Sequence, residues 1–478
     1  MLDYDLAQRG ELSLYEYLYR RIRDDIVAGL IAPDDRLPSK RSLAQHLGVS
    51  LVTVESAYAQ LVAEGYIHAR PRSGYFASAL PGLPPQVASV SPPPSAAKKS
   101  IAPASAHNED VPLEAPADPS LARLWSRALR ETLASEPEAE VFGPSPAQGL
   151  LRLRRAISAH LRQTRGMEVD PDRILVGAGA QILDNIAVQL LGHGLTYGVE
   201  DPGYPRLTRL YQANGVRLRH IPLDSEGVCM RELERQGVDV IHLMPSHQFP
   251  TGLVTSIARR YELLGWASAD AQQPAVVGQA PDTNCSLAKT RWIIEDDYDC
   301  EFRLAGRPVP ALASIDATQS VIYTNTFSKS LGAALRLAYM VLPPCLMERY
   351  NAELGFYSST VSSVQQGALA RLLESGAYER HVARMRKAKR ESRDELIGLL
   401  RAMPWGAAAP DFSIEEEDSG LHFVLAARTD LSEKDLAKRI RSTVSLPEGT
   451  RLTPLSSFAR LPQNRVRPDN LARLLVQY

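Results

Sequence analysis

The sequence predicts a multidomain chain, in which a small helix-turn-helix unit closed by a β-hairpin wing precedes a larger α/β domain. Three observations favour this fold class. Apolar residues recur at helical spacing over the first 65 residues, and a short two-strand pattern follows them. A Pro/Ala/Ser-rich stretch then covers 81–112. Beyond it, short apolar segments alternate with helical patterns, as in a mostly parallel sheet covered by helices.

Length and charge agree with this division. A chain of 478 residues is too long for one small core, so two or three domains are expected. The net charge of −1 gives no overall attraction to nucleic acid. Locally, residues 1–35 hold four Arg against eight Asp and Glu, whereas 36–75 hold five Lys and Arg against two Glu. This separation predicts a basic face for phosphate, although charge alone fits an ordinary solvated face equally well.

Cysteine usage and hydropathy point to one compartment. The four cysteines have neither metal-site nor disulfide-framework spacing, so we expect reduced thiols and no metal site. The sequence has no signal peptide and no apolar run of the ~18 residues that a membrane span needs. We therefore expect a cytoplasmic protein without a membrane partner.

The first unit should contain three helices. Leu14, Leu18, Ile22 and Ile26 share one helical face, which ends at Gly29. Ser39 and Ser50 are placed to cap a second and a third helix. Residues 66–68 and 75–76 then predict a hairpin around a turn at 70–74.

After 81–112, whose composition predicts an extended linker, five buried strands are expected at 174–176, 197–199, 240–244, 292–294 and 321–323. Each candidate functional residue of this region lies just beyond the carboxyl end of one of them, where open α/β sheets bind ligands. The polar segment 268–290 predicts an irregular surface loop, and 474–478 a final strand.

The first unit has the pattern of a winged helix that binds double-stranded DNA. Ser50, Val52 and Thr53 open the third helix and would face base edges in the major groove. Further residues at the second helix and in the wing would contact phosphates or the minor groove; these are Lys40, Arg41, Arg70, Arg72 and Gly74. A three-helix protein-interaction module is the alternative.

The second domain carries residue types suited to pyridoxal 5′-phosphate. Lys329 can form a Schiff base with the aldehyde, and Asp296 can keep the pyridine nitrogen protonated. Tyr298 can donate to the ring hydroxyl, and Tyr204 can cover the ring face. The remaining candidates supply backbone amides, hydroxyls and a guanidinium to the phosphate; these are Gly179, Ala180, Gln181, Thr326, Ser328 and Arg336. Each signal is weak alone, since an Asp-Asp-Tyr-Asp run is more often a solvated loop or a divalent-metal site.

Both halves resemble known families. Residues 11–78, including Leu37–Ala44 and Leu47–Ser50, resemble the GntR-type winged-helix head, except that Leu51 stands where many relatives carry arginine. From about 140 onward the chain is similar to fold-type-I aminotransferases. The runs EDPGYP (200–205), PSHQFPTG (245–252) and TFSKSLGAALR (326–336) resemble in particular the MocR branch of GntR regulators.

The resemblance implies a winged-helix domain at 1–80, a linker at 81–115 and a pyridoxal-phosphate-binding domain at 116–478. The last would divide into a large part (about 140–345) and a small part (about 346–478). It further implies a head-to-tail homodimer, an operator with two half-sites, and an effector with an amino group.

Two departures concern catalysis. Working aminotransferases usually place asparagine where this chain has Phe249, and Leu475 stands near the position of the arginine that binds a substrate carboxylate. Arg473 lies two residues away. We therefore expect a transcriptional regulator with at most weak transaminase activity. A true aminotransferase with an accessory DNA-binding head is the alternative, and a cofactor-free scaffold is disfavoured because the cofactor residues are all present.

Overall fold

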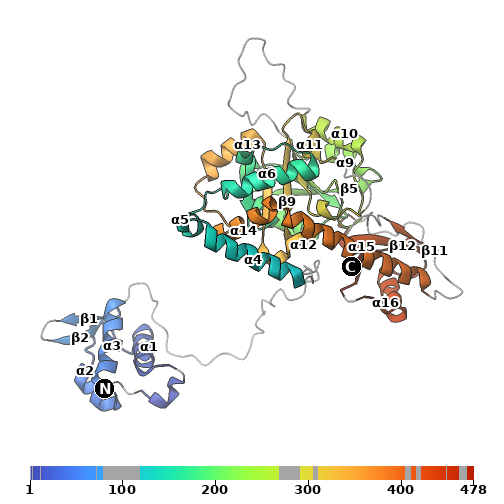
Figure 1. Ribbon diagram of the computed structural model, residues 1–478. Coiled ribbons are helices and arrows are strands. Elements are labelled where there is room, and N and C mark those ends of the chain that lie inside the picture. The colour runs from blue at the N-terminus through green and yellow to red at the C-terminus, as the bar shows by residue number, and fades with distance from the viewer. Residues whose placement is uncertain are drawn as a thin grey trace, which may run out of the picture. The chain divides into compact units, whose positions relative to one another are not determined.

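The computed structural model forms two compact units, 1–105 and 106–478 (Figure 1). It describes residues 2, 4–10, 12–70, 73–78, 119–268, 291–304, 310–403, 411–415, 421–447, 449–461, 464 and 471–478. The expected linker at 81–115, nearly all of the expected loop at 268–290, and Arg72 lie outside these residues. In the described part of the chain, no helix is both long and apolar enough to cross a membrane.

The first unit is the predicted winged helix. Its elements are η1 (Leu6–Arg9), α1 (Leu14–Val27), α2 (Lys40–Leu47), α3 (Leu51–Ala63), β1 (Ile67–Arg70) and β2 (Gly74–Ala77). Ser39 caps α2 by accepting from the amide of Ser42 at 3.1 Å, and Ser50 caps α3 by accepting from Thr53 at 3.1 Å. The antiparallel pairing of β1 with β2 confirms the hairpin.

The second unit is built on an eight-stranded sheet in the order β3-β10-β9-β8-β7-β4-β5-β6. The strands are β3 (Ile174–Gly177), β4 (Thr196–Asp201), β5 (Arg217–Asp224), β6 (Gly227–Val228), β7 (Val240–Leu243), β8 (Trp292–Asp296), β9 (Val321–Thr326) and β10 (Ala338–Val341). All neighbours from β9 to β5 are parallel, and β10 runs antiparallel to both β3 and β9. The five predicted strands are thus present and point the same way.

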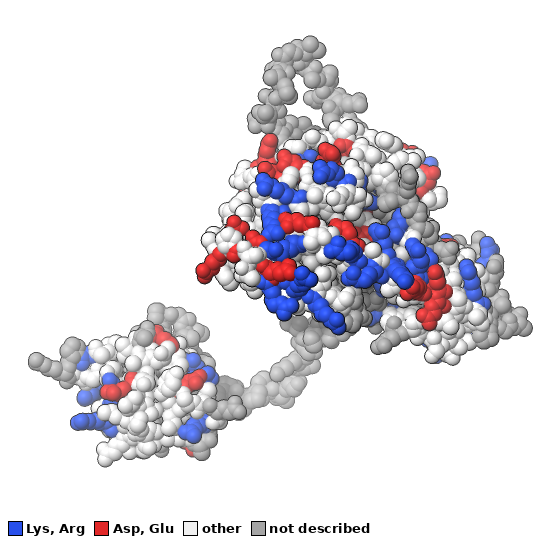
Figure 2. Space-filling model, viewed as in Figure 1, with Lys and Arg blue, Asp and Glu red and all other residues white. Residues whose placement is uncertain are grey.

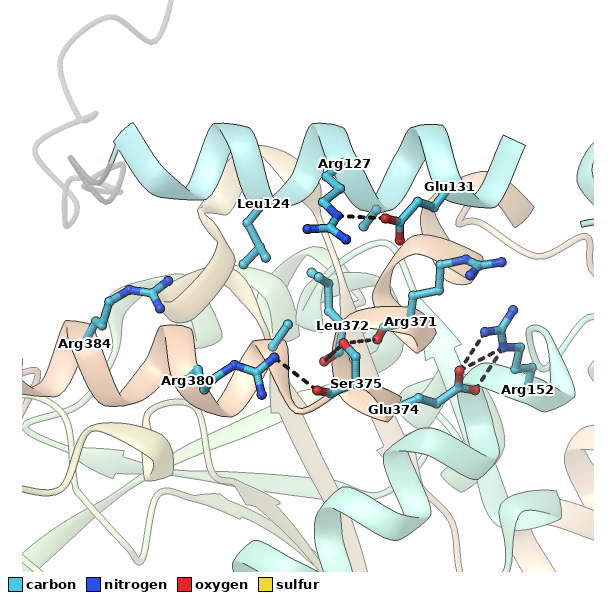
Figure 3. Close-up of a pocket in the computed structure, with 12 residues that line it drawn as sticks. Leu124, Arg127, Glu131, Arg152, Arg371, Leu372, Glu374, Ser375, Arg380 and Arg384 are labelled. Atoms are coloured by element: carbon cyan, nitrogen blue, oxygen red, sulfur yellow. Dashed lines mark hydrogen bonds and ion pairs between the residues drawn. The ribbon is translucent and has the colours of Figure 1, made fainter. Parts of the chain in front are cut away.

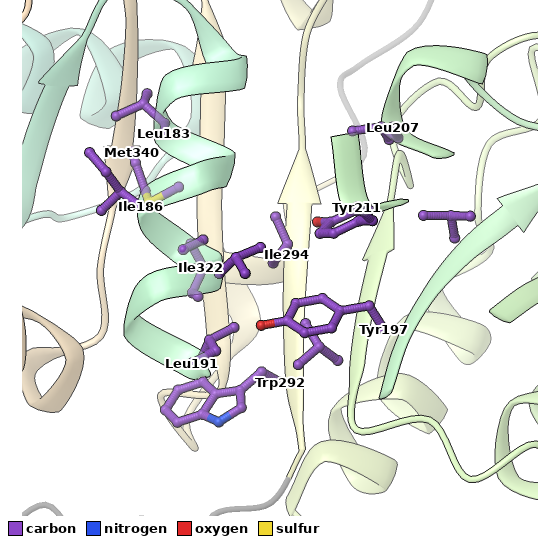
Figure 4. Close-up of a cluster of buried hydrophobic side chains, with 14 of the residues drawn as sticks. Leu183, Ile186, Leu191, Tyr197, Leu207, Tyr211, Trp292, Ile294, Ile322 and Met340 are labelled. Atoms are coloured by element: carbon purple, nitrogen blue, oxygen red, sulfur yellow. The ribbon is translucent and has the colours of Figure 1, made fainter. Parts of the chain in front are cut away.

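Helices cover this sheet (Figure 1). They are α4 (Pro119–Ser135), α5 (Glu138–Phe142), α6 (Leu151–Arg165), α7 (Ala180–Leu191), α8 (Pro205–Ala213), α9 (Met230–Arg235), α10 (Ile257–Ser268), α11 (Leu312–Ile315), α12 (Ser328–Leu331), α13 (Pro344–Arg349) and α14 (Ser363–Glu374). The aromatic rings of Tyr197, Tyr211 and Trp292 pack with α7 residues such as Leu183 on one face (Figure 4). Each such buried side chain stabilises the fold by about 1.5–3 kcal/mol.

The C-terminal part forms a separate layer. The long helix α15 (Ala377–Ala402) leads to a sheet in the order β11-β12-β14-β13, covered by α16 (Glu433–Thr443). Its strands are β11 (Asp411–Glu415), β12 (His422–Arg428), β13 (Arg451–Pro454) and β14 (Leu471–Gln477). The strand expected at the C-terminal end is therefore confirmed as β14.

Candidate functional site

A pocket of about 120 Å³ lies at the carboxyl ends of the parallel strands. Its lining contains nine of the ten residues that the sequence predicts for the cofactor. Those nine are Ala180, Gln181, Tyr204, Asp296, Tyr298, Thr326, Ser328, Lys329 and Arg336. Gly179 does not line the pocket but lies directly against Arg336. Five separate chain segments thus meet at one edge of the sheet, as strand direction requires.

One end of the pocket collects hydrogen-bond donors. Gly179 is the N-cap of α7 with φ +92°, and a Cβ there would collide with the guanidinium of Arg336. The hydroxyls of Thr326 and Ser328 lie 2.8 Å apart beside this helix start. Backbone amides at a helix N-terminus, hydroxyls and a guanidinium together form the donor set that a phosphate dianion requires.

The pocket lining also includes a carboxylate, that of Asp296. Asp296 ends β8, and its Oδ1 is buried without a hydrogen-bond partner in the described part of the chain. Its Oδ2 lies 3.8 Å from Nε2 of His242, whose Nδ1 is 2.7 Å from the Tyr211 hydroxyl. Burial alone would lower the pKa of His242, but the neighbouring carboxyls of Asp296 and Asp184 raise it above its usual value. An unpartnered carboxylate oxygen suits a protonated pyridine nitrogen, so the residues fit pyridoxal phosphate.

A histidine pair from the two sheets lies next to Tyr298, a residue of the pocket lining. His247 follows β7, and its Nδ1 lies 2.5 Å from Asp299 and 3.1 Å from the Tyr298 hydroxyl. Its ring stacks on His422 of β12 with centroids 4.3 Å apart. Burial, together with the charges of His247 and Lys329, holds the pKa of His422 well below its usual value. Burial and nearby carboxylates raise the pKa of Tyr298, which keeps its phenol protonated as a donor.

Phe249 forms an aromatic wall of the pocket. Only 6% of it is exposed, and its ring meets Tyr204 and Phe458 edge to face at 5.6 and 5.3 Å. Leu475 is fully buried in the same apolar cluster, so it offers no charge to a carboxylate. Arg473 is instead 3.8 Å from Glu415 and does not line the pocket.

Two polar lining residues were missed by the sequence analysis. Arg206 lies in the first turn of α8, directly after Tyr204 and Pro205. Asp184 lies on α7, is 3% exposed, and has an unpartnered Oδ1. Burial raises its pKa to about 7. For Asp184, the only signal in the sequence was a polar residue on an otherwise buried helical face.

Asp184 predicts a pH dependence of stability. The pKa of Asp184 is about 7 in the folded state, which is above its value in the unfolded state. Between these two pKa values, the folded state holds a proton that the unfolded state has released. The free energy of unfolding therefore falls as the pH rises towards 7. The loss approaches about 1.4 kcal/mol per pH unit. Asp184→Asn should make the dependence of stability on pH shallower by this amount, while Glu200 and Glu295, whose pKa values burial also raises to about 7, keep their own contributions. Urea unfolding of the cofactor-free protein at about pH 5 and about pH 7 measures it, and parallel curves for wild type and variant would refute the assignment.

Several DNA-facing candidates of the first unit already contact neighbouring side chains. Val52 is 68% exposed at the start of α3, whereas the hydroxyls of Ser50 and Thr53 bond to each other at 2.8 Å. Arg70 pairs with Asp34 and lies 4.4 Å from the Phe76 ring centroid. Lys40 is 3.5 Å from Glu55.

Arg41 and Gly74 complete that set. Arg41 is exposed in the first turn of α2 and has no ion-pair partner among the described residues. Gly74 starts β2 with φ +112°, a conformation in which any other residue would be strained.

Comparisons with known proteins agree with both units. Residues 14–76 match the family model of bacterial regulatory proteins of the gntR family. Residues 120–254 and 300–467 match aminotransferase class I and II. The chain is similar to the kynurenine aminotransferase of Pyrococcus horikoshii (22% identity, 76% of this chain and 84% of that one, TM-score 0.57). It is also similar to the α-aminoadipate aminotransferase LysN of Thermus thermophilus (21%, 76% and 86%, TM-score 0.56). These likenesses show the fold.

Whole-length relatives are named as regulators. The chain is 34% identical to the uncharacterized HTH-type transcriptional regulator YdeL of Bacillus subtilis over 93% of this chain and 90% of that protein. It is 31% identical to the pyridoxine biosynthesis regulator PdxR of Corynebacterium glutamicum (93% and 89%). It is 29% identical to the probable rhizopine catabolism regulatory protein MocR of Rhizobium meliloti (94% and 88%).

Fold and site thus define a protein that joins a GntR-type DNA-binding head to an aminotransferase class I and II domain. The chain belongs to the MocR branch of the GntR family of transcriptional regulators.

Proposed function

We propose that this regulator responds to pyridoxal phosphate, or to an amino-group effector that reaches the cofactor, through its aminotransferase-like domain. The observation that carries the proposal is the pocket around Lys329, which retains a complete set of cofactor-type residues in a chain that also has a DNA-binding head. Binding in the pocket would shift the balance between two conformations that differ in DNA affinity.

The chain's own residues have separable roles in this proposal. Gly179, Ala180, Thr326, Ser328 and Arg336 would hold the phosphate at the start of α7. When bound, pyridoxal phosphate supplies an electrophilic aldehyde and an electron-withdrawing ring.

At the ring end, Asp296, backed by His242, would keep a proton on the ring nitrogen, and Tyr298 would donate to the ring hydroxyl. Lys329 would hold the cofactor covalently through its amino group, the same kind of group that an amino ligand would offer.

Arg206 is the cation best placed for an effector carboxylate. It lines the pocket, whereas Arg473 faces Glu415 and Leu475 is apolar. The lining also contains Leu207, Met244 and other apolar side chains. We therefore propose a small amino acid or related amine as the effector class. The second candidate, a working aminotransferase with an accessory head, draws support from the same lysine, but the described residues of the pocket lining offer only Arg206 and Arg336 as arginines.

We also propose a head-to-tail homodimer in the cytoplasm, because an operator with two half-sites needs two heads with access to DNA. Large apolar side chains are exposed on the second unit, including Phe142 (74%) and Phe356 (78%). Such residues are common where a partner subunit covers them. Phe356→Asp should shift the full-length protein from dimer to monomer in sedimentation velocity. A variant that stays fully dimeric would place the interface elsewhere.

The proposed DNA contact of the head can be tested at Arg41. Arg41→Ala should remove one phosphate contact and reduce the log–log salt dependence of DNA affinity by about 0.9. The measurement is fluorescence anisotropy of the full-length protein on duplex DNA over a range of KCl concentrations. Arg9→Ala, also an exposed arginine of the same unit, serves as control. Unchanged affinity together with an unchanged slope would take Arg41 out of the interface.

Two measurements on the same protein test the proposal as a whole. The first is a visible absorption spectrum before and after borohydride, and the second is DNA binding with and without amino ligands. A coloured protein whose DNA affinity responds to ligand supports it. A colourless protein, or one whose DNA binding never responds, rejects it.

A further inference from the structure

The strongest concentration of positive charge lies outside both sites described above. Residues 380–390 of α15 contain six Lys and Arg and no Asp or Glu, in a chain whose net charge is −1. Three of the six are tied to the body of the domain, because Arg386, Lys389 and Arg390 donate to backbone carbonyls of Glu301, Tyr478 and Leu304. The other three, Arg380, Arg384 and Lys387, are exposed.

These three residues form a row. Their spacing of four and then three residues places them on one side of α15, about 6 Å apart for the first pair along the helix axis. Helix α4 carries a second row of exposed arginines at the same kind of spacing, namely Arg123, Arg127 and Arg130. Lys and Arg side chains gather over this face of the second unit (Figure 2).

A groove of about 520 Å³ lies between the two helices (Figure 3). Arg127 reaches over it from α4, and Arg380 and Arg384 come from α15 on the other side. We name this surface, the groove with Arg123, Arg130 and Lys387 beside it, the α4–α15 face. The lining also includes the apolar side chains of Leu124 and Leu372.

The acidic groups of the groove are already matched. Glu131 pairs with Arg127 at 2.7 Å, and Glu374 pairs with Arg152 at 2.6 Å. Arg380 donates to the carbonyl of Ser375 at 3.1 Å, and neither Arg380 nor Arg384 has a carboxylate partner in the described part of the chain. The groove thus keeps an excess of guanidinium groups that internal ion pairs do not explain.

We propose that the α4–α15 face binds the phosphate backbone of DNA, as a second contact surface in addition to the winged-helix head. This rests on the proposed DNA-binding function of the head. Guanidinium groups bind phosphate oxygens in a bidentate manner, and a double row of cations fits a polyanion that continues past the groove at both ends. The described residues of α15 expose no large apolar side chain, and α4 exposes one, Leu133 at 51%, whereas an interfacial membrane helix presents a whole apolar face.

Contacts of this kind carry no base information. The surface therefore adds affinity and fixes the path of the DNA, while the head reads sequence. Because the cations belong to the unit that holds the pocket, a ligand-driven movement of that unit would change the DNA path directly.

The test uses the full-length protein and a random-sequence linear duplex. The variant Arg380→Gln/Arg384→Gln removes two charges but keeps side-chain length. It should lower the log–log salt slope by about 1.8, since each lost phosphate contact removes about 0.9. The matched control Lys434→Gln/Lys438→Gln removes two exposed charges from α16 and should leave the slope unchanged. Far-UV circular dichroism and the melting temperature verify the fold of each variant. If the double variant fails to fold, Arg384→Gln alone replaces it, and the log–log salt slope should then fall by about 0.9.

The outcomes separate this proposal from the DNA-binding function itself. If Arg41→Ala weakens DNA binding but the groove variants match wild type, the α4–α15 face is not a DNA surface although the head is. If the wild type binds no duplex at all, the DNA-binding function fails. Binding to phosphatidylserine vesicles that the groove variants lose, with unchanged DNA slopes, would assign the face to lipid and overturn the proposal.

Discussion

Replacing Lys329 with alanine should abolish covalent attachment of pyridoxal phosphate and leave the purified protein without its yellow colour. Lys329 is the one lysine of the pocket lining, which it shares with Thr326, Ser328 and Asp296. The phosphate-binding groups remain in the variant, so pyridoxal phosphate should still bind, but weakly and reversibly. We expect an effect close to all-or-none, because no other side chain of the pocket can form the bond.

Borohydride reduction followed by peptide mass spectrometry measures this outcome. Wild type should carry the adduct on the peptide that contains Lys329, and Lys329→Ala should carry none. Lys434→Ala, an exposed lysine on α16, is the matched control and should label like wild type. An adduct on another peptide of wild type, or a stable covalent adduct in Lys329→Ala, would show that the assignment is wrong.

Much of the fold could be predicted because local rules agreed with the final packing. Ser39 and Ser50 cap α2 and α3 as their positions indicated, and Gly48 ends α2 in the left-handed conformation. The five strands were recognisable as continuous apolar runs, since both faces of a parallel sheet are covered. Their shared direction then brought the candidate residues to one edge.

Other features depend on contacts between distant segments and left no local pattern. Strand β10 lies between β3 and β9 and pairs antiparallel with both. The periodicity of apolar residues along the sequence does not show which strands pair with each other. His242 is internal to β7 and reads as a core residue, yet it lies 3.8 Å from Asp296. His422 reaches the pocket region from the second sheet, 175 positions after the His247 on which it stacks. Asp184 and Arg206 escaped notice for the same reason.

For the winged-helix unit, the sequence alone predicted some DNA contacts whose side chains the structure shows to be engaged elsewhere. Thr53 appeared free to read bases, but its hydroxyl bonds to Ser50, whereas Val52 is 68% exposed at this helix start. Arg70 is occupied by Asp34 and Phe76. A single sequence gives the residue types of an interface, whereas the competition among neighbouring partners appears only once the side chains are placed.

The largest functional effect that we expect is that the protein binds amino ligands but turns them over slowly. A ligand needs only Lys329 and Asp296 in place to engage the cofactor. Transamination also needs the substrate carboxylate held firmly, so that the reacting C–H bond is perpendicular to the ring. Here Leu475 is buried among apolar side chains, and Phe249 is an aromatic residue of the pocket lining. Of the two arginines in that lining, Arg336 lies against Gly179 at the expected phosphate site, so Arg206 is the described arginine left for the carboxylate. A misplacement of about 1 Å can cost a hundredfold in rate, so turnover should be at least about a hundredfold slower than in ordinary aminotransferases.

The ligand should act on DNA instead. A panel of amino acids and amines, assayed with the full-length protein, should change the visible spectrum and also the DNA affinity or footprint length, with α-keto product formation near background. Arg206→Ala should abolish the effect of carboxylated ligands while leaving that of simple amines, which separates carboxylate recognition from binding at Lys329. The isolated head should bind DNA far more weakly than the full chain, because it loses the second half-site. Multiple turnovers at ordinary enzyme rates, combined with DNA binding that no ligand alters, would instead identify a working aminotransferase with an accessory head.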